Sequence, residues 1–151
     1  PNPVNIDPSV FDNIGNIVNN IVNIPRCIFD NNSNTKTIYF GNGQSNLTDQ
    51  AVATLNELEK FLQQQEDDDV DVKSITIEGH ASSPGSDASN QTLSENRAQE
   101  VSDVFYADYG SKITTRGYGE TRLVIENGVE NEAKSRRVVI KVELTKNSCN
   151  N

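Results

Sequence analysis

Hydrophobic residues near the start of the chain recur with the period of an α-helix. Asp7 is a suitable N-cap, Pro8 suits the first helical position, and Pro25 supplies a stop. We therefore expect an amphipathic helix over about 8–23, whose apolar face either packs on its own domain or forms a seam with a second copy of the chain. The apolar stripe consists of Val10, Ile14, Ile17, Ile21 and Ile24.

A polar, turn-rich linker over 30–36 precedes the first expected strand, at 37–40, where Thr-Ile-Tyr-Phe favours β-structure. Thr48 is a suitable N-cap for the helix that follows. The acidic run 66–69 lies at the C-terminal end of that helix, where the macrodipole disfavours negative charge. We interpret it as a solvated loop rather than a calcium site. The buried face of the helix is expected to carry Ala51, Leu55, Leu58 and Leu62.

The second half of the chain continues the alternation of strands and helices. Strands at 74–78 and 113–117 flank a helix from Asn90 to about Tyr109, and the last and longest strand covers 137–144. The order βαβαβ-β predicts an α/β fold, a two-layer sandwich in which the helices pack on one sheet.

These patterns divide the 151 residues into one domain and two terminal segments. We expect an N-terminal extension over 1–35 that contains the amphipathic helix and the linker, the α/β domain over 36–145, and a tail over 146–151. No apolar stretch is long enough to span a membrane, and residues 1–4 lack the basic patch and apolar run of a signal peptide. The chain is therefore expected to be a mature or trimmed soluble segment.

Charge and residue types limit the classes of function. The chain has 22 Asp and Glu against 13 Lys and Arg, which excludes nucleic acid as a partner because that affinity needs clustered basic residues. Cys27 and Cys149 have no metal-ligand spacing, so neither a metal nor a cofactor is predicted. His80 is the single histidine, and beside Ser82 and Ser83 it lacks the orienting group and oxyanion hole of a triad. No catalytic residue is predicted.

An arginine occupies the face of the third expected helix that should pack on the sheet. The stripe consists of Leu93, Arg97, Val101 and Phe105, at intervals of four. A buried guanidinium needs a partner. Arg97 either reaches past its neighbours to solvent or pairs with an internal carboxylate, or it binds an external anion near the start of the helix. The spacing leaves these alternatives open.

Several short motifs follow one another between 37 and 144. They are Tyr39-Phe40, Glu78-Gly79-His80, Gly85, Asn90, Leu93-Ser94, Arg97-Ala98, Val101, Gly117-Tyr118-Gly119-Glu120 and Arg136-Arg137-Val138. Their order and spacing resemble the OmpA-like family of peptidoglycan-associated domains (the OmpA C-terminal, Pal and MotB type), with its GHTDxxG loop, YNxxLSxxRAxxV helix, GYGE turn and NRRV strand. The acidic loop near 66–71 is slightly longer than in the family.

The resemblance implies a non-catalytic domain of a bacterial envelope that binds the stem peptide of peptidoglycan through diaminopimelate. In the family, an aspartate of the GHTD loop receives the ammonium group and the arginine of LSxxRA receives the carboxylate. Arg97 matches that arginine. However, Ser82 stands at the aspartate position and Ala81 at the threonine before it, while Gly41 and Gly43 replace the acidic residues after the first strand.

The missing aspartate predicts a degenerate site. Loss of a charged partner should weaken binding by roughly 1.5 to 3 kcal/mol, or about ten to a hundred fold. Ser89 replaces the family tyrosine, and Asp87 is an alternative source of a carboxylate if the loop folds back. The resemblance assigns the ligand site to Arg97, Ser82, Asn90, Ala81, Gly41, Phe40 and Leu93.

Two functions are compatible with this pattern. The domain anchors an envelope protein to peptidoglycan, or it keeps the fold without the ligand and acts as a structural or protein-interaction domain in a secretion, motility or stator-like complex. The helix expected over about 8–23 would then be a docking or homodimer surface. Both hypotheses place the domain in the periplasm, either tethered to the outer membrane or as part of an envelope complex.

An oxidising periplasm favours a disulfide between Cys27 and Cys149, which would tether the C-terminal tail. It would close a loop of about 120 residues and stabilise the fold by about 4 to 5 kcal/mol in the chain-entropy model. The alternative is two unpaired thiols.

Overall fold

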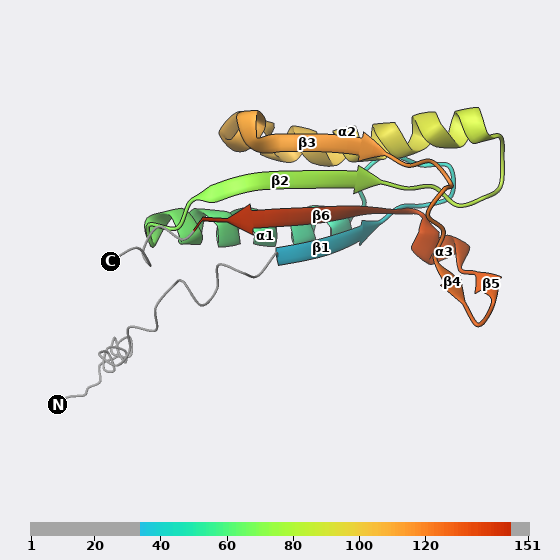
Figure 1. The fold of residues 1–151 in the computed structure, drawn as a ribbon, viewed down its shortest axis with the longest axis horizontal. Helices are drawn as coiled ribbons and strands as arrows, with labels where there is room; N and C mark the ends of the chain where they lie inside the picture. Colours follow the sequence, from blue (N-terminus) through green and yellow to red (C-terminus); the bar gives the residue numbers. More distant parts are fainter. Residues whose placement is uncertain (1–33, 146–151) are drawn as a thin grey trace. The chain divides into compact units, whose positions relative to one another are not determined.

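Four strands form the main sheet of the computed structural model, which describes residues 34–145. They are β1 (Asn34–Tyr39), β2 (Val72–Gly79), β3 (Ile113–Gly117) and β6 (Arg137–Leu144), in the spatial order β1-β6-β2-β3. β1 pairs antiparallel with β6, and β2 pairs parallel with β3. Figure 1 shows β6 running opposite to the other three strands, so the sheet is mixed.

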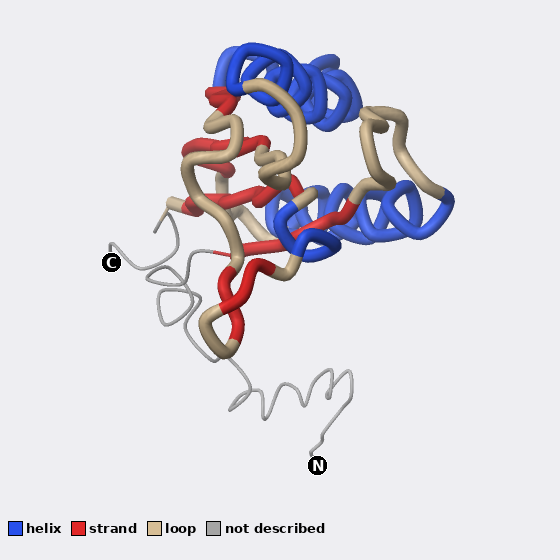
Figure 2. Tube along the Cα trace, turned by 90° about the vertical axis from the view of Figure 1, so that its right-hand side faces the viewer, coloured by secondary structure: helices blue, strands red, loops and turns tan. Residues whose placement is uncertain are grey.

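Two long helices, α1 (Asp49–Asp67) and α2 (Asp87–Tyr109), lie on the same side of the sheet (Figure 2). The Thr48 side chain accepts a hydrogen bond of 3.1 Å from the Ala51 amide, so the predicted N-cap is confirmed. α2 ends at Tyr109, as predicted, and Gly110 is its C-cap. The predicted α/β fold with helices packed on one sheet is likewise confirmed.

The core lies between the helices and the sheet. Alternate residues of β6 are buried, which gives the period of two that a half-covered sheet requires. The predicted apolar face of α1 is also buried. The core residues of α1, β2, α2 and β6 include Leu55, Leu58, Leu62, Ile75, Ile77, Val101, Phe105, Val138, Ile140 and Val142.

Some predicted boundaries were wrong. The residues 34–36, expected in the linker, belong to β1, because they pair with residues 140–142 of β6. Glu66 and Asp67, expected in a solvated loop, are the last residues of α1. β2 extends two residues earlier and one residue later than the predicted 74–78.

The start of α2 was also placed too late. Ser86 is its N-cap and accepts from the Ser89 amide at 3.1 Å, so the helix begins at Asp87 rather than at Asn90. Asp87 is exposed in the first turn and does not fold back over the loop.

Several short elements were not predicted. A 3₁₀ turn, Gly110–Lys112, precedes β3. β4 (Ile125–Glu126) and β5 (Val129–Glu130) form a hairpin, and α3 (Glu132–Ser135) follows it. Asn127 and Gly128 both have positive φ, at 55° and 80°, which matches the tight turn that Asn-Gly favours in short hairpins. These elements are too short for a periodic signal.

The predicted helix over about 8–23, both cysteines and the C-terminal tail lie outside the described residues. Within residues 34–145, no helix is long and apolar enough to cross a membrane. No group of three or more His, Cys, Asp or Glu in that part of the chain could hold a metal ion.

Candidate functional site

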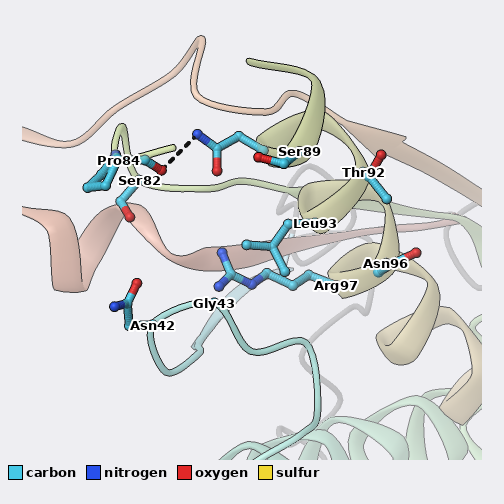
Figure 3. Close-up of a pocket in the computed structure, with 10 residues that line it drawn as sticks. Asn42, Gly43, Ser82, Pro84, Ser89, Thr92, Leu93, Asn96 and Arg97 are labelled. Atoms are coloured by element: carbon cyan, nitrogen blue, oxygen red, sulfur yellow. Dashed lines mark hydrogen bonds between the residues drawn. The ribbon is translucent and has the colours of Figure 1, made fainter. Parts of the chain in front are cut away.

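A pocket of about 420 Å³ lies beside the first turns of α2 (Figure 3). The turn after β1, the loop after β2 and the N-terminal half of α2 supply its walls. Arg97 is the only charged residue among the ten described residues that line it. The ten are Asn42, Gly43, Ser82, Pro84, Ser89, Asn90, Thr92, Leu93, Asn96 and Arg97.

Arg97 is held by main-chain carbonyl groups from both neighbouring loops. Its Nε donates to the Gln44 carbonyl at 2.7 Å, its Nη1 to the His80 carbonyl at 2.9 Å and one hydrogen of Nη2 to the Gly41 carbonyl at 3.1 Å. The guanidinium also lies over the Phe40 ring, 5.2 Å from its centroid. The side chain therefore ties the loop after β1 to the loop after β2.

The Arg97 side chain is 0% exposed, and no carboxylate in residues 34–145 pairs with it. Burial, and secondarily the nearby Arg136 cation, lower its pKa to about 10, so the group stays charged at neutral pH. Among residues 34–145, neither a solvent-exposed guanidinium nor an internal ion pair, two of the sequence-based alternatives, is observed for Arg97. Three of the five N–H donors are used, which leaves one on each terminal nitrogen. A guanidinium with one unused N–H on each terminal nitrogen can donate to both oxygens of a carboxylate.

Ser82, which the resemblance aligns with an aspartate, lines the pocket and is 6% exposed. Its hydroxyl has no hydrogen-bond partner among the described residues. Ala81 is buried beside it but does not line the pocket; its amide donates to the Gly119 carbonyl at 2.8 Å. The neighbouring Ser83 turns away, with its amide and hydroxyl both donating to the Glu130 carboxylate of β5.

Asn90 lies in the first turns of α2 and is 5% exposed. Its Nδ2 donates to the Pro84 carbonyl at 3.1 Å, the bond dashed in Figure 3, and to the Glu120 carboxylate at 2.6 Å. The amide therefore joins the loop after β2 to the turn after β3.

The residues predicted from the resemblance occupy different places around the pocket. Arg97, Ser82, Asn90 and Leu93 line it. Phe40 and Gly41 contact Arg97 through the ring and the carbonyl group described above, and Ala81 is bonded to the Gly119 carbonyl instead of lining the pocket.

Other lining residues were not predicted. Thr92 and Asn96 could have been found from the helix period, because Asn96 follows the predicted Leu93 by three positions and Thr92 precedes Asn96 by four. Asn42 had no signal of its own in the sequence. Glu120 was noted only as part of a motif, and its contact with Asn90 joins residues 30 positions apart.

His80 has a structural setting. It is 2% exposed and stacks on Tyr118 with ring centroids 5.4 Å apart. Burial, followed by the Arg137, Arg122 and Lys141 cations, lowers its pKa to about 4, so it is neutral at physiological pH. Neither ring nitrogen has a hydrogen-bond partner among the described residues. The side chain therefore lacks the serine and carboxylate contacts of a catalytic base.

The fold and the pocket define a small α/β domain with two long helices on one mixed sheet and a pocket beside α2. The model of the OmpA family matches residues 39–137, and the chain belongs to this family. Membership confirms the predicted class: a periplasmic, non-catalytic domain of the kind found in outer-membrane proteins and lipoproteins.

Three similar proteins illustrate the relationship. Outer membrane porin F of Pseudomonas aeruginosa is 37% identical over 110 residues, which cover 70% of this chain and 30% of the porin. The OmpA-like domain of FopA1 from Francisella tularensis superposes with a TM-score of 0.61 at 24% identity, covering 74% of this chain and 73% of that domain. The peptidoglycan-associated lipoprotein from Burkholderia pseudomallei gives a TM-score of 0.56 at 19% identity, covering 73% and 90%. The chain spans less than a third of the porin's length.

Proposed function

We propose that this domain binds peptidoglycan non-covalently by holding the zwitterionic end of a diaminopimelate stem peptide in the pocket beside Arg97. It thereby anchors an envelope protein to the cell wall. The name of the structurally similar peptidoglycan-associated lipoprotein from Burkholderia pseudomallei supports this ligand class.

The observation that carries the proposal is the state of Arg97. It is a fully buried cation without a carboxylate partner in residues 34–145, and it has two unused N–H donors beside a pocket. A buried charge is costly unless an opposite charge compensates it. A ligand carboxylate would supply that compensation through a bidentate, charge-assisted pair.

Binding requires the pocket to open slightly. Because Arg97 is 0% exposed, a ligand reaches the guanidinium only when a neighbouring wall moves. The Asn42-Gly43 turn is the most suitable element, since Gly43 has a φ of 68° and a Cβ there would meet no atom within 4 Å. This opening costs free energy and reduces the apparent affinity.

The site is degenerate because the ammonium group of the ligand faces neutral Ser82 instead of a carboxylate. Restoring the charge with Ser82→Asp should strengthen binding by about ten to a hundred fold, since a charged partner contributes roughly 1.5 to 3 kcal/mol. The measurement is calorimetric titration of the chain with a diaminopimelate-containing stem peptide. Ser89→Asp is the matched control, because Ser89 also lines the pocket but is exposed, so it adds the same charge in solvent.

Equal gains from Ser82→Asp and Ser89→Asp would contradict the assigned geometry, because a general change in charge would then explain both. Failure of the natural chain and of Ser82→Asp to bind would reject the proposed function.

The second candidate function is a structural or protein-interaction domain whose ligand site has lapsed. Three carbonyl groups already hold Arg97, so this side chain stabilises the two loops without a ligand, which favours this second function. Sedimentation with purified sacculi distinguishes the two functions. Binding by Ser82→Asp but not by the natural chain would favour the second.

A further inference from the structure

We infer that Glu120 supplies, through Asn90, the negative charge that the pocket lacks at position 82, and that Asn90 Oδ1 is the acceptor for the ligand's ammonium group. Glu120 is then a positioning residue for zwitterion recognition. This inference rests on the proposed function and specifies how the site recognises its ligand.

The orientation of the Asn90 amide is determined by its partners. Both hydrogen bonds of Nδ2 go to groups that only accept, the Pro84 carbonyl and the Glu120 carboxylate. A flipped amide would place Oδ1 against two acceptors, which is unfavourable. The amide nitrogen therefore faces the loop and the turn, and the oxygen is left for another partner.

Asn90 Oδ1 is available to a ligand. No described residue donates to it, and it is not among the fully enclosed polar atoms without a partner. Because Asn90 lines the pocket while being only 5% exposed, the remaining access to this oxygen is through the pocket. An ammonium group is a donor with three hydrogens and can satisfy both Asn90 Oδ1 and the free Ser82 hydroxyl.

Glu120 is fixed firmly enough to act through Asn90. The Tyr118 amide donates to the Gly79 carbonyl of β2 at 3.0 Å, and the Gly119 carbonyl accepts from the Ala81 amide of the following loop at 2.8 Å. These two bonds anchor the turn before Glu120. The Gly119 amide also donates to Ser94 Oγ of α2 at 2.8 Å. No cation in residues 34–145 forms a salt bridge with Glu120, so its charge is not neutralised locally.

The charge of Glu120 acts in two ways. A hydrogen bond to a carboxylate polarises the amide and makes Oδ1 a stronger acceptor. The carboxylate also attracts an ammonium group in the pocket directly. Only the buried Asn90 side chain would separate the two charges, so solvent screens this attraction weakly. The ten lining residues contain no carboxylate, and Glu120 is the carboxylate in residues 34–145 that accepts a hydrogen bond from one of them, Asn90.

The test removes the charge and keeps the shape. Glu120→Gln retains an oxygen that can accept from Asn90. Two probes are titrated: a stem tripeptide ending in diaminopimelate, and the same tripeptide ending in 2-aminopimelate, which keeps the distal carboxylate and lacks the distal amine. We expect the natural chain to prefer the first probe, and Glu120→Gln to reduce that preference by about ten fold while leaving the second probe unaffected.

Glu100→Gln is the matched control, since Glu100 is exposed on α2 and its loss changes the net charge equally. Thermal unfolding verifies that each variant is folded. Equal binding of both probes by the natural chain would overturn the inference, as would an equal effect of Glu120→Gln on both probes or no effect at all. Binding of neither probe by the natural chain would reject the proposed function, and this inference with it.

Discussion

At the scale of single residues, the environment of a side chain determines its role more than its type does. His80 beside two serines looks like a catalytic pair in the sequence, yet Ser83 is bonded to Glu130 and His80 is buried against Tyr118. Arg97 occupies an apolar stripe, yet it is a buried cation bonded to carbonyl groups rather than an exposed or ion-paired residue. In both cases long-range contacts supply the explanation.

The buried, neutral His80 should make stability depend on pH. Its pKa is about 4 in the folded protein against 6.5 in the unfolded chain, so the unfolded state binds the extra proton between these values. The contribution of His80 to stability should therefore be present above about pH 6.5 and fall by on the order of 3 kcal/mol as the pH drops to about 4. Urea unfolding of the natural chain and of His80→Gln at pH 7 and pH 4.5 measures this loss.

Because carboxylates also titrate in this range, the informative quantity is the difference between the two proteins. The free energy of unfolding of His80→Gln should fall less from pH 7 to pH 4.5. Parallel losses in both proteins would show that His80 does not contribute.

At the scale of elements, the close approach of α2 to the ends of β2 and β3 places the pocket residues. A Cβ on Gly79 would overlap the Ser94 carbonyl of α2, and one on Gly117 would lie 2.5 Å from Glu95 Cγ. Both glycines therefore allow α2 to lie directly against the strand ends. The same contact brings Asn90 within reach of Glu120.

Gly79→Ala should destabilise the fold by about 2 to 3 kcal/mol, because backbone of α2 would have to move to make room. Gly41→Ala is the control: its Cβ would meet Gln44 Cγ at an acceptable 3.4 Å, and its φ is not positive. Its effect on stability should stay below about 1 kcal/mol. Chemical denaturation of the three proteins measures this difference, and similar midpoints for all three would contradict the close packing.

At the scale of the whole molecule, the chain and its proposed ligand both carry a net negative charge. The chain carries a formal net charge of −9, while the pocket presents a single cation, Arg97. A stem peptide with net negative charge is therefore repelled at long range and attracted only within the pocket. Salt screens exposed charges beyond about 10 Å but affects a buried pair much less.

Raising the salt concentration from about 20 to 200 mM should therefore strengthen binding of such a peptide by a few fold. Calorimetric titration at both concentrations measures the change. A clear loss of affinity with salt would mean that attraction by exposed cations governs binding instead.

The sequence by itself determined the family, the α/β class, the order of the four main strands along the chain and both long helices, because period and capping are local properties. It also singled out Arg97 and Ser82, which line the same pocket in the structure. Only the tertiary structure decided that carbonyl groups hold Arg97, that residues 34–36 join β1 and that Glu120 reaches Asn90. Each of these depends on contacts between segments distant along the chain, whose partners are selected by strand pairing and core packing rather than by any local pattern.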